Sequence, residues 1–193
     1  MGKGRMEAFS DGVIAVIITV MVLELKVPAG GSLADIRPML PMFLTYVLSF
    51  INVGIYWTNH HHMLHAARSV TGPILLANLH LLFWLSVMPF ATAWMAEHPF
   101  QSAPVAVYGV MLIMNALSYS LLTFLLMRHE GPDSALVKAV GSDLKGKVSI
   151  GFYLAGLALS PFQPQLSLTL YVAVAVMWFI PDRRIERVLR TQP

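Results

Sequence analysis

Six apolar stretches, separated by short segments rich in proline, glycine or charge, constrain the fold of this chain more than any other feature. A helix needs about 20 mostly apolar residues to cross the hydrocarbon core of a bilayer. The stretches lie at residues 8–27, 38–58, 73–95, 104–127, 148–162 and 165–181. They predict an all-α integral membrane protein with six transmembrane helices, folded as one domain over residues 1–193.

The scarcity of charge supports a membrane location. Charged residues make up 12% of the chain and apolar residues 56%, whereas a typical soluble domain has about 25% and about 45–50%. So few charges do not cover a surface that faces water, and membrane lipid is therefore the expected surroundings. This composition argues against a disordered chain, a soluble enzyme and a nucleic-acid partner, despite an isoelectric point of about 9.3.

Prolines mark several of the expected helix boundaries. Pro38, Pro73 and Pro104 stand at or near the first residue of three apolar stretches, where the missing N–H of proline costs nothing. Pro161 lies near the end of the fifth stretch, and Pro164 lies between the fifth and the sixth. We expect them to form a tight turn, so that these two stretches make a hairpin.

The distribution of basic residues predicts the orientation of the chain. With six spans, both termini and two of the loops lie on one side of the membrane. Eleven of the 13 lysines and arginines fall on that side, and the opposite side has only Lys26 and Arg37. Cytoplasmic segments carry an excess of basic residues. The sequence therefore predicts a multi-pass protein with both termini in the cytoplasm.

The first apolar stretch has two distinct faces on a helical wheel. At about 100° per residue, one stripe brings together a small set of side chains: Gly12, Val16, Thr19, Val20 and Leu23. Asp11 lies well away from this stripe. The stripe fits either a pore lining or a packing face between helices. If it lines a pore, Glu24 at its outer end is placed to attract cations at the mouth.

Polar residues near one end of the first three stretches suggest a network. An ionisable residue inside a span costs roughly 2.5–3.5 kcal/mol, so it usually has a partner or a task. We expect the network to draw on the following side chains: Arg5, Ser10, Asp11, His60, His61 and His80. One interpretation is a structural tie between helices through charge-assisted hydrogen bonds. The other is a proton relay or pH sensor, because histidine titrates near neutrality.

The histidine run at residues 60–65 invites a metal hypothesis, which the rest of the sequence does not support. His61 and His65 are four residues apart and can share a helix face, as zinc ligands do. No third ligand has matching spacing, so we expect neither a metal site nor a membrane metalloenzyme. The chain also lacks a phosphate-binding glycine loop, a nucleophile motif and a paired-carboxylate site. It is therefore not expected to be an enzyme or to bind a cofactor.

One motif resembles a known family. Arg5 is followed after three residues by Phe9-Ser10-Asp11, and the same stretch ends in Leu23-Glu24-Leu25-Lys26-Val27-Pro28. These features closely resemble bacterial members of the transmembrane protein 175 family, the prokaryotic relatives of the lysosomal potassium channel. The likeness extends to residues 56–61, 84–94 and 178–181, and so covers nearly the whole chain.

The resemblance implies a fold and a pore. Family members similar to this chain are homotetramers in the bacterial inner membrane, with six spans per chain and a central pore lined by the first helices. Matching positions make Val16, Val20 and Leu23 hydrophobic pore layers and Thr19 a polar layer. Arg5 and Phe9-Ser10-Asp11 correspond to the inter-helix network instead of the pore. Val16 stands where a larger isoleucine or leucine is usual, which leaves open which ring is narrowest.

The resemblance also implies the ions and leaves one alternative. It predicts a passive potassium-permeable leak channel with weak preference over sodium. Permeant potassium is the expected partner, and sodium, caesium and protons are further candidate ions. The alternative is a proton-coupled secondary transporter that uses Asp11 and the membrane histidines. Transporters commonly contain inverted repeats and broken helices, and neither is evident in the sequence.

Overall fold

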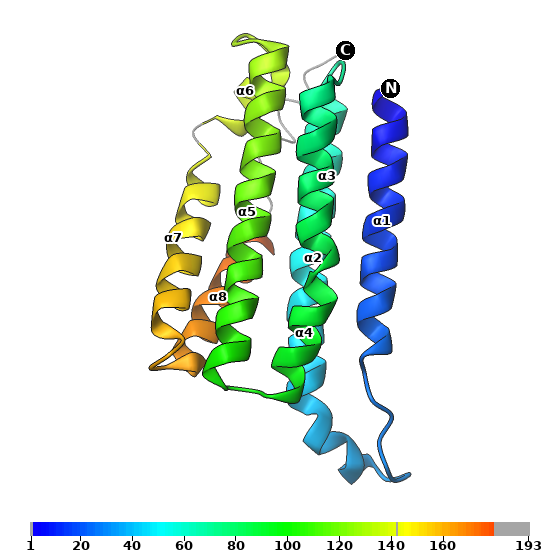
Figure 1. Ribbon diagram of the computed structural model, residues 1–193, viewed down its shortest axis with the longest axis vertical. Coiled ribbons are helices and arrows are strands. Elements are labelled where there is room, and N and C mark those ends of the chain that lie inside the picture. Colours follow the sequence, from blue (N-terminus) through cyan, green and yellow to red (C-terminus); the bar gives the residue numbers. More distant parts are fainter. Residues whose placement is uncertain (1, 142, 180–193) are drawn as a thin grey trace.

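The protein is a bundle of helices (Figure 1). The computed structural model describes residues 2–141 and 143–179, and every regular element in this part of the chain is helical. The elements in chain order are α1 (Lys3–Leu23), the 3₁₀ helix η1 (Leu33–Met39), α2 (Leu40–Ala66), α3 (Gly72–Ser86), α4 (Met88–Glu97), α5 (Ser102–Glu130), α6 (Ala135–Val140), α7 (Leu144–Leu159) and α8 (Pro164–Phe179).

Four segments of the described chain are long and apolar enough to cross a membrane. They are Lys3–Leu23, Leu33–Ala66, Gly72–Glu97 and Ser102–Glu130. The expectation of an all-α membrane protein is therefore confirmed. Helices α7 and α8 have 16 residues each, about 24 Å at a rise of 1.5 Å per residue, which is shorter than the hydrocarbon core. The number of spans therefore remains a prediction.

The helix boundaries differ from the expected stretches at several ends. Helix α1 begins at Lys3, well before residue 8, and α2 continues to Ala66, so the whole histidine run is helical. Helix α6 has no counterpart among the apolar stretches, and the Ser134 side chain accepts a hydrogen bond from the Val137 amide at its start. The end of the sixth predicted span at residues 180–181 and the arginines 183, 184, 187 and 190 lie outside the described residues.

The stretch predicted as one helix over 73–95 is divided. Helix α3 ends at Ser86 and α4 begins at Met88, although Figure 1 shows the two following one line. Pro89 explains the break, because proline has no N–H to donate to the preceding turn and its ring crowds that turn's carbonyl. Pro89 is buried within the bundle.

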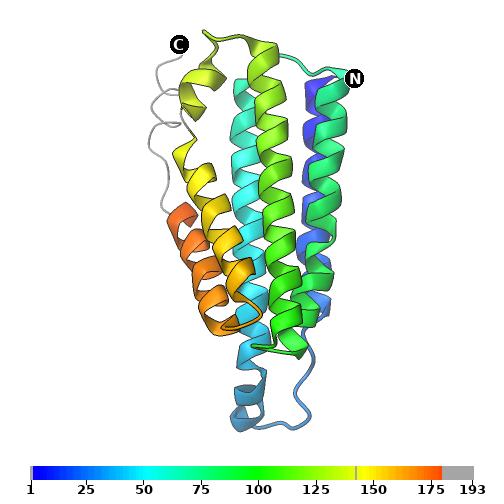
Figure 2. The same cartoon turned by 60° about the vertical axis from the view of Figure 1, so that its left-hand side comes forward.

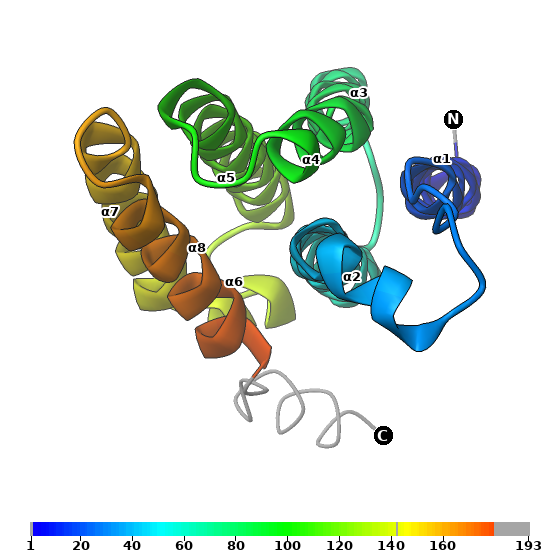
Figure 3. The same ribbon diagram turned by 90° about the horizontal axis from the view of Figure 1, so that it is seen from below.

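Helix α1 stands at one edge of the bundle. Seen from below in Figure 3, it packs on α2, α3 and α4 from one side only. The α7–α8 hairpin lies at the other side, against α5 (Figure 2). There the Tyr171 ring packs between α5 and α7, at two positions without a side chain, Gly109 and Gly156. The described part of the chain thus leaves one long face of α1 uncovered.

Candidate site on the first helix

The two faces of α1 have opposite surroundings. Its buried residues point into the bundle and are Met6, Ser10, Ile14, Ile17 and Met21. On the other side, Val16 is 59% exposed, Val20 38% and Leu23 79%. The stripe predicted from the sequence therefore faces away from the bundle, and it is not buried against the parts of this chain that the structure describes.

The exposed stripe is apolar apart from one hydroxyl. Thr19 Oγ1 donates a hydrogen bond of 2.9 Å to the carbonyl of Val16, so its proton is held by the helix backbone. The lone pairs of this oxygen remain on the exposed side, where they are free to accept a hydrogen bond or to face a cation. The stripe thus offers apolar side chains with one hydroxyl group and no charged residue between Gly12 and Leu23.

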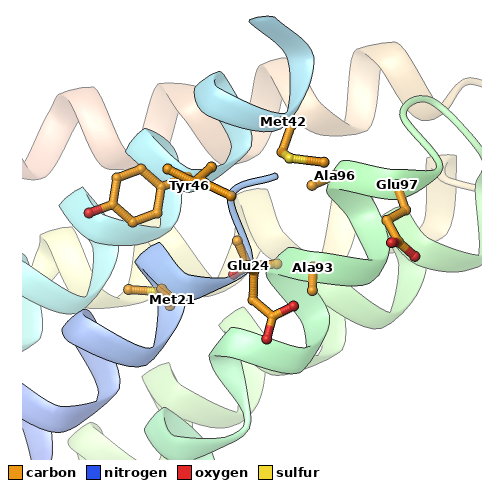
Figure 4. Close-up of a pocket in the computed structure, with 9 residues that line it drawn as sticks. Met21, Glu24, Met42, Tyr46, Ala93, Ala96 and Glu97 are labelled. Carbon is orange, nitrogen blue, oxygen red and sulfur yellow. The ribbon is translucent and has the colours of Figure 1, made fainter. Parts of the chain in front are cut away.

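Glu24 lies where α1 ends, beside a small pocket. The pocket is formed by the ends of α1, α2 and α4 and is lined by Met21, Glu24, Leu25, Met42, Tyr46, Thr92, Ala93, Ala96 and Glu97 (Figure 4). Lys26 Nζ and Glu97 Oε1 form an ion pair of 2.6 Å across the same ends. Two carboxylates thus lie close to the outer end of the stripe, and one of them is neutralised within the chain.

A buried hydrogen-bonded chain ties α1 to α2 and α3. Asn78 Nδ2 donates to Ser10 Oγ over 2.9 Å, and Asn78 Oδ1 lies 2.7 Å from His60 Nε2. The Ser10 hydroxyl in turn donates to the Met6 carbonyl over 2.8 Å. All three polar side chains are buried. Asn78 was not among the predicted site residues, although its position in the third stretch, two residues before His80, was a usable signal.

The order of donors in this chain follows from its acceptors. An amide oxygen only accepts hydrogen bonds, so His60 Nε2 carries the hydrogen atom and donates a hydrogen bond to Asn78 Oδ1. His60 Nδ1 is then the lone-pair nitrogen, and it has no partner among the described residues. No carboxylate belongs to this chain of hydrogen bonds. It is suited to holding three helices together, and it has no group to pass a proton beyond His60.

Asp11 and His61 lie in a separate, more exposed seam between α1 and α2. Asp11 Oδ1 accepts a hydrogen bond of 2.9 Å from Trp57 Nε1. His61 Nδ1 lies 3.1 Å from Glu7 Oε1. The His61 ring also stacks on the Trp57 ring, with centroids 6.4 Å apart. Polar groups on this seam therefore pair across two helices, away from the buried chain.

The remaining residues of the expected network lie outside both groups. His80 Nε2 accepts a hydrogen bond of 3.0 Å from Trp84 Nε1, one turn along the same exposed helix face. Arg5 and Phe9 are exposed on α1, and the described part of the chain offers the Arg5 guanidinium no hydrogen-bond or ion-pair partner. The structure thus joins Ser10 to His60 through Asn78 and leaves His80, Arg5 and Phe9 elsewhere.

The histidine run forms a stack of rings. The rings of His61 and His65 are stacked with centroids 6.1 Å apart. Within residues 2–141 and 143–179, no group of three or more histidine, aspartate or glutamate side chains is placed to hold a metal ion. The described residues therefore provide no set of metal ligands.

The fold and the site define a multi-pass helical membrane protein whose first helix presents an apolar stripe outward. The profile of the family described as endosomal/lysosomal potassium channel TMEM175 matches residues 5–89. A potassium channel of Chryseobacterium sp. (strain P1-3) is 54% identical over 190 residues, which is 98% of this chain and 99% of the relative. The chain belongs to the TMEM175 family of potassium channels, and thus to a family of channels instead of enzymes.

Two further comparisons extend the likeness. The crystal structure of a lysosomal potassium-selective channel TMEM175 homolog from Chamaesiphon minutus superposes with a TM-score of 0.81 and 29% identity, covering 94% of this chain and 97% of that one. The human protein named endosomal/lysosomal proton channel TMEM175 is 33% identical over 103 residues, which is 47% of this chain and 20% of the relative. The chain therefore has the TMEM175 channel fold.

Proposed function

We propose that this chain forms a potassium-permeable leak channel of the bacterial inner membrane. Four copies surround one axis, each with six transmembrane helices, and α1 lines a pore that conducts passively with weak preference for potassium over sodium. The observation that carries the proposal is the outward stripe of Val16, Thr19, Val20 and Leu23, opposite the buried face of α1. The printed names of the bacterial relatives as potassium channels support the choice of ion.

The size of the exposed side chains favours a pore over a lipid-facing surface. Between Gly12 and Val20, the exposed residues of α1 are small or branched, namely Gly12, Ala15, Val16, Thr19 and Val20. The exposed faces of α3 and α4 instead carry large ones, namely Leu76, Leu79, Phe83 and Phe90. Small side chains are common where membrane helices approach one another closely. A face of this kind suits four helices that meet around one axis.

The chemistry of the stripe predicts modest selectivity. No carbonyl cage is present on the exposed face of α1 to replace the hydration shell of an ion, and apolar constrictions gate by dewetting. Leu23 is the largest and most exposed member of the stripe, so its ring is our candidate for the narrowest layer. Glu24 follows it at the outer mouth, where a ring of carboxylates raises the local concentration of cations.

The topology follows from the alternating direction of the helices. In Figure 1, α8 runs toward the end of the bundle at which α1 begins. We assign α7 and α8 as the fifth and sixth spans and place both chain termini in the cytoplasm, because the basic residues concentrate on that side. Because these two helices are shorter than the hydrocarbon core, the bilayer becomes thinner around them.

Potassium efflux from proteoliposomes that contain the purified protein tests the proposal. We expect potassium to leave faster than sodium with no pH gradient, and Leu23→Trp to block the flux. Leu166→Trp is the matched control, because Leu166 is exposed in the first turn of α8. Helix α8 begins at the end of the bundle at which α1 ends, on the side of the bundle away from α1 (Figure 1). Equal loss of flux in both variants, or flux that needs a proton gradient, contradicts the proposed pore. The second outcome points to the transporter that uses Asp11 and the membrane histidines.

A further inference from the structure

Arg5 lies on the same face of α1 as the proposed pore lining. It is 18 residues before Leu23, which is five turns at 3.6 residues per turn. Val16 lies within about 20° of the same line at 100° per residue. Arg5 is exposed, as is Phe9 one turn further along. The resemblance implies a place for Arg5 in an inter-helix network, but in this chain Arg5 is exposed, and its guanidinium has no partner on the described parts of the neighbouring helices.

Nearby charged groups of the same chain are engaged elsewhere. Lys3 Nζ donates a hydrogen bond of 2.8 Å to the carbonyl of Ala67 and so turns toward α2. The Glu7 and Asp11 carboxylates also turn toward α2, where they pair with His61 and Trp57. Among the described residues none is bonded to the Arg5 guanidinium. The Arg5 guanidinium is therefore left on the outward face of α1 with no bonded counter-ion among the described residues.

We propose that Arg5 forms a cationic ring at the cytoplasmic entrance of the channel and makes inward current larger than outward current. The inference rests on the proposed tetrameric pore. Four guanidinium groups around one axis repel cations that approach from the cytoplasm. Glu24 at the opposite end of α1 attracts cations from outside. Charges at the mouth of a low-dielectric path change the local ion concentration and the rate of entry from that side.

Salt screening gives the proposal a specific signature. The Debye length is about 30 Å at 0.01 M salt and about 3 Å at 1 M. At low salt, the electric field of the four Arg5 side chains acts on ions throughout the entrance. At high salt, the field is screened within about 3 Å of the charges. We expect inward current to exceed outward current by about threefold near 0.01 M potassium chloride and by little at 1 M, because Coulomb energies in water are small and screened.

The experiment measures current in excised inside-out patches from cells that express the full chain, with the same potassium chloride solution on both sides. The readout is the ratio of inward to outward current at equal and opposite voltages. We expect Arg5→Gln to reduce this ratio at low salt and Arg5→Lys to keep it. Lys3→Gln is the matched control, since it removes the same charge two residues away, from a side chain that is bonded to α2. Lys3→Gln should change the ratio of inward to outward current much less than Arg5→Gln does.

Three outcomes overturn the inference. The first is a current ratio that is unchanged in Arg5→Gln. The second is an equal decrease of the ratio in Lys3→Gln. The third is loss of the oligomer of Arg5→Gln on size-exclusion chromatography, because this result would assign Arg5 to a contact between helices. Failure of the underlying pore is distinguishable. A current that Leu23→Trp does not reduce contradicts the pore itself, whereas a current blocked by Leu23→Trp with an unaltered ratio in Arg5→Gln contradicts only the role of Arg5.

Discussion

Replacing Asn78 with leucine tests how the buried hydrogen-bonded chain holds α1 in place. Leucine has a similar volume, so the change removes hydrogen bonds without opening a large cavity. Two bonds are lost, one to Ser10 Oγ and one to His60 Nε2, each contributing about 0.6–1 kcal/mol. Ser10 keeps its bond to the Met6 carbonyl. His60 does not keep a partner, because its other ring nitrogen already lacks one among the described residues.

The unpaired His60 donor dominates the expected loss. A buried polar group left without a partner costs about 1–3 kcal/mol. Together with the lost bonds, Asn78→Leu should lower the free energy of unfolding by about 3 kcal/mol, or the melting temperature by about 6 °C or more for a chain of this length. Ser10→Ala should cost about 1 kcal/mol, because it removes a single bond of the chain and leaves Asn78 bonded to His60.

The double variant His60→Leu/Asn78→Leu separates this explanation from simple damage to the core. Replacing both partners of a buried hydrogen bond by apolar groups is far less costly than removing one. We therefore expect the double variant to melt above Asn78→Leu, measured by fluorescence-detected unfolding of the protein in detergent. If Asn78→Leu melts like the wild type, or if the double variant is less stable than Asn78→Leu, the reasoning is refuted.

Two further predictions concern packing and surface charge. Gly156→Ala should destabilise the protein by about 2 kcal/mol, because its new methyl group meets the Tyr171 ring and overpacking forces neighbours to shift; Gly151→Ala on the same helix, with open space around it, should be neutral or slightly stabilising in the same melting assay. Glu97→Gln should change the melting temperature only slightly, because the Lys26 and Glu97 side chains are 65% and 48% exposed and exposed ion pairs contribute little to stability. A loss as large as that of Gly156→Ala, or one that 1 M salt leaves unaltered, contradicts a screened surface pair.

The positions of the long helices were predictable from the sequence because lipid imposes a strict condition on backbone polar groups. Every N–H and C=O in the hydrocarbon core needs a hydrogen-bond partner within the protein. A long apolar stretch that crosses the membrane therefore forms a helix. The break between α3 and α4 was missed even though Pro89 is printed in the sequence. Proline in a membrane helix is compatible with either a kink or a break, and neighbouring helices decide between them.

The partners of the polar side chains were less predictable than their depth. A helical wheel places Ser10 and Val16 about 120° apart around α1, and in the structure Ser10 is buried and Val16 exposed. The helical wheel does not show which neighbouring helix each face of α1 contacts. His80 was placed in the network by depth alone, yet its face of α3 turns outward and its ring bonds to Trp84. Asn78, two residues earlier, points the other way and completes the chain.

The attachment of α1 to the bundle is uneven along its length, and this bears on how a pore built from it opens. In the first three turns, polar contacts of residues such as Ser10 and Asp11 tie α1 to α2 and α3. Between Ile14 and Leu23 the side facing the bundle is purely apolar, until Lys26 meets Glu97 beyond the helix end. Lipid tails are as apolar as these side chains, so apolar contact alone holds membrane helices together weakly. The C-terminal half of α1, which carries the proposed constriction, is therefore the half that can shift at least cost, while polar contacts hold the N-terminal half to the bundle.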